Sequence, residues 1–150
     1  MLAEQPSALL TLEEKGPIAP PPKLATMFQD VARTIQSWPG LVAATHWLST
    51  DPTKVDGADF YVGKDELGHI HLNGECHVAT TKPMQKALLH HDLAGRFPWD
   101  TSWSTFRMVT PEDARQGLWL FRLAYDRING TPPDELLASI AAGPPRNALQ

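Results

Sequence analysis

The residues with the clearest chemical potential are three histidines between positions 69 and 77: His69, His71 and His77. Imidazole titrates near neutral pH, transfers protons and is a common metal ligand. In a β-strand, residues two apart share a face, so His69 and His71 should point the same way. The pair therefore predicts a proton acceptor, or half of a metal site, on a rigid strand.

The turn that follows decides which other side chains join this pair. Residues 73–74 are Asn-Gly, the dipeptide that best tolerates the positive φ angles of a two-residue type I′ hairpin turn. With that turn, His69, His71 and Cys76 share one face of the hairpin, and His77 points to the other face. His69 and His71 are therefore the candidate catalytic pair, with a metal site as the other chemical interpretation.

A metal ion would need a third or fourth ligand from elsewhere in the chain, with Glu66, Cys76 and His91 as candidates. The interpretation preferred here is that no metal binds; the alternative ligand set is His69, His71 and His91. The other interpretation of the histidine pair is that it lies on a partly solvated sheet face with no chemical role. His46 is interpreted as structural.

One metal-binding pattern is matched only in part. The spacing of Gly63, His69, His71 and Glu75 resembles the opening of the cupin motif, but Lys82 stands where that motif closes with glycine. No second motif follows, and long amphipathic helices contradict a mostly β barrel. The pattern therefore does not predict a cupin.

Aromatic and charged residues near position 100 predict a second part of a site. Trp99, Asp100, Trp103 and Arg107 could line a pocket for a planar anionic ligand through stacking and charge-assisted hydrogen bonds. The alternative is that Trp103 only covers the sheet. The predicted substrate-binding residues are Glu66, Cys76, His91, Trp103, Arg107 and Tyr125.

The elements that must position these residues follow from hydrophobic periodicity and turn signals. They are a helix from Lys23 that ends at Pro39 and Gly40, strands at 41–47, 58–62, 67–72, 75–79 and 103–109, a helix beginning at Pro83, a helix at 110–128 capped by Thr110, and a short helix at 132–142. This order predicts an α+β fold with an antiparallel sheet of about five strands and helices packed on one face. Pro-containing flexible tails are expected at 1–22 and 144–150, around a domain at 23–143.

Composition restricts the kinds of partner. The chain of 150 residues carries a formal net charge of −4 with acidic and basic residues interspersed, which predicts no nucleic-acid binding. No segment approaches the roughly 18 apolar residues of a membrane span, and no signal peptide is recognised. With one cysteine, no intrachain disulfide can form. We expect a soluble, cytoplasmic domain that binds a small molecule; a homo-oligomer is compatible with these features.

Five segments, taken together and in order, resemble the luciferase-domain family. They are SWPG at 37–40, FYVGKDELGHIH at 60–71, HHD at 90–92, SWSTFRM at 102–108 and LFRLAYDR at 120–127. This family includes fungal luciferase and many small bacterial proteins. The resemblance implies oxidation of an α-pyrone or similar enol by molecular oxygen, with no metal or organic cofactor.

That resemblance suggests a role for each candidate residue. Cofactor-free oxygenation starts when a base removes the proton of an enol in a dry pocket, and His69 or His71 would be that base. Arg107 would hold the resulting anion, and Trp103 would stack on its ring. The leading hypothesis is a luciferase-like oxygenase. The alternative is a non-catalytic ligand- or metal-binding module, or a protein-interaction domain that uses the histidine face and Trp119.

Overall fold

The structure is a computed structural model, and it describes residues 17–145. The predicted tails therefore fall mostly on residues 1–16 and 146–150, outside the described part. Residues 17–22 lie along the first strand of the sheet. The Thr45 N–H donates to Ala19 O at 2.9 Å, and the Thr45 hydroxyl donates to Pro20 O at 2.6 Å. This stretch is thus hydrogen-bonded to β1.

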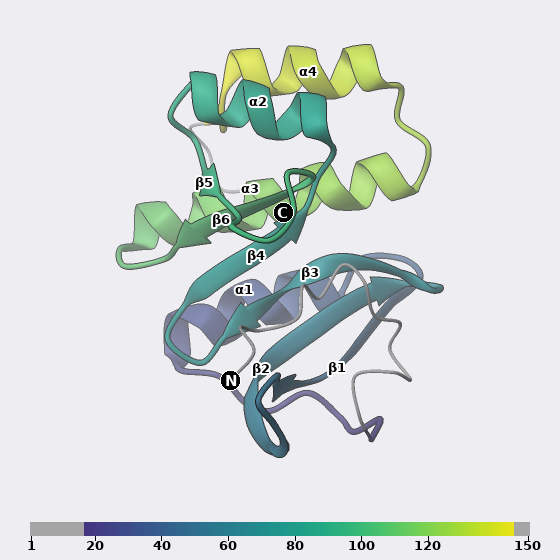
Figure 1. The fold of residues 1–150 in the computed structure, drawn as a ribbon, viewed down its shortest axis with the longest axis vertical. Helices are drawn as coiled ribbons and strands as arrows, with labels where there is room; N and C mark the ends of the chain where they lie inside the picture. The colour runs from purple at the N-terminus through teal and green to yellow at the C-terminus, as the bar shows by residue number, and fades with distance from the viewer. Residues whose placement is uncertain (1–16, 146–150) are drawn as a thin grey trace.

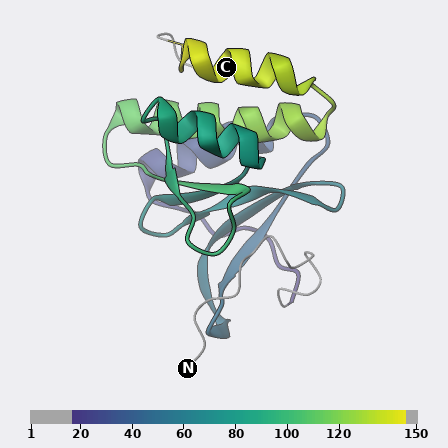
Figure 2. The same ribbon diagram turned by 45° about the horizontal axis from the view of Figure 1, so that its top comes forward.

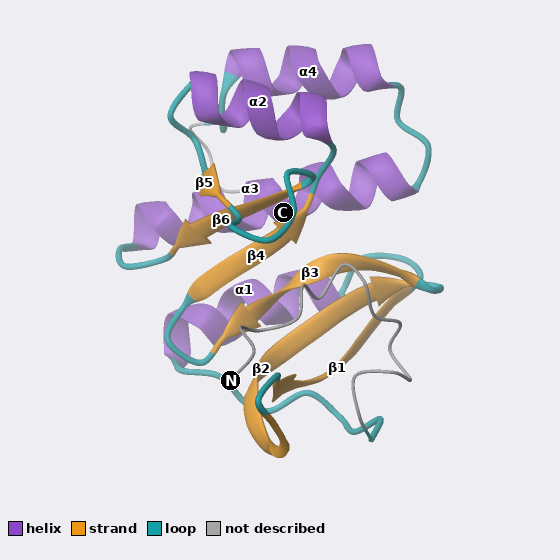
Figure 3. Cartoon of the chain, viewed as in Figure 1, coloured by secondary structure: helices purple, strands orange, loops and turns teal. Residues whose placement is uncertain are grey.

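The fold is α+β, as predicted, with four helices and a six-stranded antiparallel sheet in the order β1-β2-β3-β4-β6-β5 (Figures 1 and 3). The strands are β1 (Leu41–Leu48), β2 (Asp51–Val62), β3 (Asp65–His71), β4 (Glu75–Ala79), β5 (Gly95–Arg96) and β6 (Trp103–Arg107). The helices are α1 (Thr26–Gln36), α2 (Lys82–His90), α3 (Pro111–Ile128) and α4 (Pro133–Ala142). Sequence analysis missed β5 because two residues are too short to show a period.

The helices gather on one side of the sheet. Helices α1 and α3 contact each other and the strands β1 to β4, while α2 packs against α4 and against the β5–β6 edge. Figure 2 shows the helices above the sheet. The core between them contains Phe60, Ile70 and Val78 from the strands and Leu120 and Phe121 from α3, all fully buried. Within the described residues, no helix is long and apolar enough to cross a membrane.

Helix α3 begins as its sequence predicts. Thr110 is the N-cap: its hydroxyl accepts from the Asp113 N–H, and the Asp113 carboxylate accepts from the Thr110 N–H, which forms a capping box. The prediction for Trp119 is wrong, because its side chain is 5% exposed and packs in the core. It therefore offers no contact surface to a partner.

The hairpin between β3 and β4 differs from the prediction by one residue. Three residues, 72–74, form the loop, and the Gly74 N–H donates to His71 O at 2.9 Å. His69 consequently pairs with His77, and Ile70 pairs with Cys76. A shift of one residue exchanges the two faces of a strand. His77 therefore joins the face of His69, whereas Cys76 turns into the core beneath the helices.

Candidate functional site

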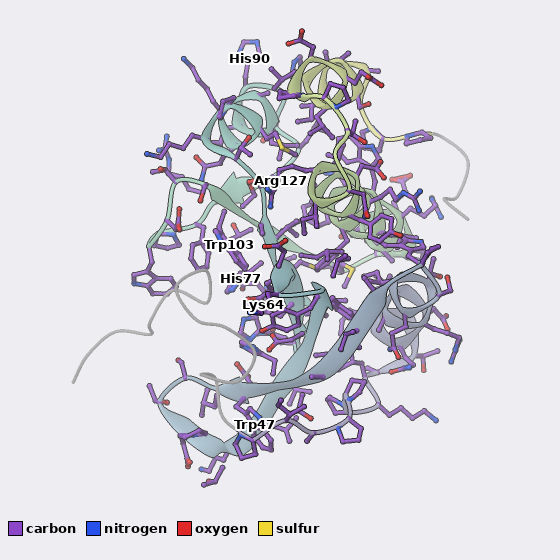
Figure 4. All side chains as sticks on the ribbon, turned by 90° about the vertical axis from the view of Figure 1, so that its right-hand side faces the viewer. Trp47, Lys64, His77, His90, Trp103 and Arg127 are labelled. Carbon is purple, nitrogen blue, oxygen red and sulfur yellow. The ribbon has the colours of Figure 1, made fainter. Side chains whose placement is uncertain are left out.

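Four buried histidines lie together on the sheet face opposite the helices. His46 comes from β1, His69 and His71 from β3, and His77 from β4; their exposed fractions are 5%, 1%, 9% and 7%. Figure 4 places His77 and Trp103 in the middle of the molecule and His90 at its end. We call these four residues the histidine cluster. It confirms the predicted common face of His69 and His71, corrects the predicted face of His77, and places His46 beside them.

Strand register brings carboxylates to the same face. Asp59 of β2 pairs with His69 across the β2–β3 ladder. A bulge follows, since Phe60 pairs with Gly68 but Tyr61 pairs with Glu66, and Leu67 is the extra residue. A bulge changes which face the next side chain takes, so Glu66 lies beside His69 while Leu67 enters the core.

Glycine is required where β3 passes the cluster. Gly68 has a φ of 144°, and an added Cβ would lie 2.1 Å from His77 O and 3.0 Å from the Phe121 ring. A side chain at this position would thus push β3 away from β4 on one side and from α3 on the other. The close approach of β3 and β4 holds His69 within reach of His77.

Each histidine of the cluster has one ring nitrogen against a carboxylate. His46 Nδ1 lies 2.7 Å from Asp59 Oδ1, and His71 Nδ1 lies 2.7 Å from Asp56 Oδ2. His69 Nδ1 lies 3.1 Å from Glu66 Oε2, and His77 Nε2 lies 2.9 Å from Glu75 Oε2. An ionised carboxylate only accepts hydrogen bonds, so each of these contacts has the geometry of a ring N–H that donates to a carboxylate.

The remaining nitrogens of three of these rings face one another. His69 Nε2 and His71 Nε2 lie 3.0 Å and 3.2 Å from His77 Nδ1. His46 stacks on His69 with 3.9 Å between ring centroids. A neutral imidazole carries a single N–H. When that N–H donates to the carboxylate, the second ring nitrogen presents a lone pair. Nitrogens that face one another at these distances can share a proton or hold another cation between them.

An aromatic chain leads from the cluster to the surface. The Phe97 ring lies 4.9 Å from the His77 ring, 5.7 Å from Trp103 and 5.2 Å from Trp99. Trp103 is buried and its ring centroid is 6.0 Å from that of His69, whereas Trp99 is 40% exposed. The predicted grouping of Trp99 and Trp103 is therefore observed, with Phe97 as the residue that connects them to the cluster.

Arg107 and Glu75 form the edge of the site. Arg107 Nη2 donates to Glu75 Oε1 at 2.9 Å, and both line an open pocket of about 350 Å³ beside β5. Burial raises the pKa of the Glu75 carboxyl, but the hydrogen bond from His77 and the charge of Arg107 lower it more, and the pKa lies below its usual 4.5. Glu75 thus links the pocket to His77 as an anion.

Three residues predicted to bind substrate lie away from the cluster. Cys76 is fully buried on the helix side, where burial raises the pKa of its thiol far above the usual 9.0. His91 is exposed at the end of α2 rather than on the inward face, because the helix ends at His90. Tyr125 lies on α3, on the helix side of the sheet, and its hydroxyl donates to Pro39 O at 2.6 Å. Glu66, Trp103 and Arg107 do lie at or near the cluster.

The cluster also has the composition of a metal centre. One ligand atom from each of His46, His69 and His71 falls within 4.8 Å of the other two, as does one from each of Asp59, Glu66 and His69. The predicted alternative set contained His91, whose place is taken by His46. A histidine so far from His69 in sequence gives no signal without the β1–β2 and β2–β3 register.

Comparison with known proteins gives one partial match to a family model. Residues 64–124 match the family model of the luciferase domain. This match confirms the resemblance recognised in the sequence, and it covers β3, β4 and β6 with most of α3. No curated protein and no solved structure matches the chain significantly.

Proposed function

Since residues 64–124 match the luciferase domain, we propose that this protein is a small-molecule oxygenase whose histidine cluster acts on an enolic substrate. The substrate class is an α-pyrone or another aromatic enol, and molecular oxygen is the co-substrate. The proposal includes no organic cofactor. The observation that supports it best is the arrangement of four buried imidazoles with their outer nitrogens held by carboxylates.

The first step is removal of the enol proton. His71 is the most exposed member of the cluster at 9%, so its Nε2 is the proton acceptor proposed to meet the substrate. Asp56 accepts from His71 Nδ1 and stabilises the imidazolium that forms. His77 and His69 follow at hydrogen-bond distance and can pass the proton inward.

The second step is the reaction with oxygen. The electron pair of the broken O–H bond stays on the substrate as an enolate, which donates electrons to O₂. A carbon–oxygen bond forms, oxygen is reduced to a peroxide anion on the substrate, and the imidazolium can return the proton to that anion. The buried surroundings of the cluster exclude water, which protects such an intermediate from hydrolysis.

The aromatic chain supplies the binding surface for a planar ring. Trp99 and Phe97 lie between solvent and His77, and rings of this kind favour stacked or edge-to-face contact with an aromatic ligand. Arg107, half exposed and bound to Glu75, lies at the rim and would attract an anionic substituent.

The alternative of a protein-interaction domain loses its main residue, because Trp119 is buried. A ligand- or metal-binding module without catalysis uses the same cluster as the oxygenase. The two are separated by whether oxygen is consumed.

Oxygen consumption by the full chain, freed of metal with a chelator, tests the proposal against a panel of hydroxy-α-pyrones and phenols. We expect consumption with at least one compound, and a loss of about 10²–10⁴-fold in His71→Ala, the usual contribution of a general base. His90→Ala is the matched control, because His90 is exposed and distant from the cluster. No consumption with any compound, or equal rates in His71→Ala and the native protein, would contradict it.

A further inference from the structure

The outer contacts of the histidine cluster resemble those of protein-bound transition metals. In metal centres, a ligating histidine donates its second ring N–H to a carboxylate or carbonyl, which fixes the tautomer and aims the other nitrogen at the ion. All four clustered histidines have such a carboxylate, from Asp59, Glu66, Asp56 and Glu75, at 2.7 to 3.1 Å. A buried histidine needs a hydrogen-bond partner, but that partner need not be a carboxylate. The same imidazole–carboxylate contact at all four rings is therefore more typical of a metal centre.

The inward spacing is also that of ligands. Two nitrogens bound to one tetrahedral zinc ion at its usual bond length lie about 3.3 Å apart. His77 Nδ1 is 3.0 Å from His69 Nε2 and 3.2 Å from His71 Nε2. His46 adds a fourth ring whose ligand atom falls within 4.8 Å of those of His69 and His71. The nitrogens of His69 and His71 thus have ligand-like spacing to that of His77. The His46 ring lies nearly parallel to that of His69, with an angle of 11° between their planes, so it packs beside such a site.

Charge favours a cation at this place. The carboxylates of Asp56, Asp59, Glu66 and Glu75 contact the four rings, and Asp59 is fully buried. Buried negative charge is costly unless a positive charge lies near it. An additional proton on the cluster would supply one positive charge, and a divalent ion would supply two.

We propose that the histidine cluster binds one divalent transition-metal ion on the helix-free face of the sheet, with His69 Nε2, His71 Nε2 and His77 Nδ1 as its ligands. Neutral imidazole ligands suit Zn²⁺, Co²⁺, Ni²⁺, Cu²⁺ and Fe²⁺ rather than Mg²⁺ or Ca²⁺. The proposal does not depend on the oxygenase reaction, because binding is measured on the protein without substrate. An ion and a proton would compete for the same nitrogens.

Calorimetric titration of the chelator-treated full chain with ZnCl₂ measures binding, and addition of Co²⁺ reports the ligands through its visible absorption. We expect one ion per chain and an absorption band of four-coordinate Co²⁺. At zinc concentrations about 100 times the Kd, the Tm should rise by about 5–10 °C. Absence of binding to the folded protein would overturn the proposal.

Substitutions locate the ion. His77→Gln and His69→Gln should abolish the Co²⁺ band. Asp56→Asn, which leaves all four rings in place, should weaken zinc binding about 10- to 100-fold. Because Asp56 has 25% of its side chain exposed, this variant keeps the test valid if a histidine variant fails to fold.

The double variant His90→Ala/His91→Ala is the control for adventitious binding, since these neighbouring histidines are exposed on α2. Binding should be unchanged in it. If this control loses the ion while Asp56→Asn and the cluster variants keep it, the ion is held by the surface pair and the proposal is wrong.

Discussion

The two faces of the sheet are built from the same strands but carry different kinds of side chain. On the helix face, Phe60, Ile70 and Val78 pack against α3 in the core. Their immediate neighbours in sequence, Asp59, His69 and His77, form the polar cluster on the other face. Alternation of side chains along a strand thus places packing and chemistry one residue apart.

The two faces contribute differently to the stability of the fold. Apolar burial on the helix face stabilises the fold, whereas buried ionisable groups on the other face are at best near neutral when each is paired. The cluster is fully paired, with a carboxylate on every imidazole. Buried ionisable groups of this number do not stabilise a sheet. Their presence is the main reason to propose that the functional site lies on the helix-free face. Substitutions on the helix face should therefore change stability, and those on the cluster face should change chemistry.

The largest stability effect is expected at the centre of the helix face. Phe121 is fully buried with its ring 5.7 Å from that of Phe60, so Phe121→Ala should lower the free energy of unfolding by about 3–5 kcal/mol. Urea unfolding followed by circular dichroism measures it. Val109→Ala is the control: Val109 is 69% exposed and should change stability by less than about 0.5 kcal/mol. Equal effects of the two substitutions would contradict the claim that packing on the helix face stabilises the fold.

The next effect tests how closely β3 approaches β4 and α3 at Gly68. Gly68→Ala should cost about 3 kcal/mol, because a Cβ would collide with His77 O and strain the backbone. Gly63→Ala is matched in having a positive φ of 61° but no atom within 4 Å, and should cost about 1 kcal/mol. Thermal unfolding compares them. If Gly68→Ala is as mild as Gly63→Ala, β3 and β4 are not held this closely.

The smallest effect is expected at the cap of α3, far from the cluster. Partial burial raises the pKa of Asp113, but the N–H groups of Val109 and Thr110 lower it more, and it lies below the usual 3.8. A carboxyl of lowered pKa stabilises the fold above its unfolded pKa and loses that effect as the pH falls through the folded value.

Asp113→Ala should therefore destabilise the protein by about 0.5 kcal/mol at neutral pH, a value kept small by solvent screening. The difference from the native protein should close as the pH falls below 3.8. Unfolding at a series of pH values measures it. A difference that persists unchanged in acid would mean that the carboxylate charge is not responsible.

Most of the helices and strands, and the common face of one pair of histidines, were predicted from the sequence. The period of α3 and its Thr110-Pro111 start were predicted because local capping decides them. The shared face of His69 and His71 was predicted because strand geometry alone decides it. Family resemblance was recognised from short segments in order, and residues 64–124 confirm it.

The rest of the site depends on register, which local sequence does not decide. An Asn-Gly dipeptide permits a two-residue turn, but this hairpin uses a three-residue loop with Gly74 at a φ of 89°. The one additional loop residue shifts the register, so that His77, and not Cys76, lies on the face of His69. His46 reaches the cluster only through two strand ladders, one of which carries bulges after His46. Such long-range pairing is a property of the whole sheet.

The most direct test of the central claim is a crystal structure of the protein with a non-reactive hydroxy-α-pyrone analogue. We expect the ring beside Phe97 and Trp99, with its hydroxyl at hydrogen-bond distance from His71 or His77. The main competing place is the apolar pocket of about 350 Å³ lined by Met84, Arg127 and Leu136, between α2, α3 and α4. An analogue bound there, with the histidine cluster untouched, would contradict the claim that the helix-free face is the functional site.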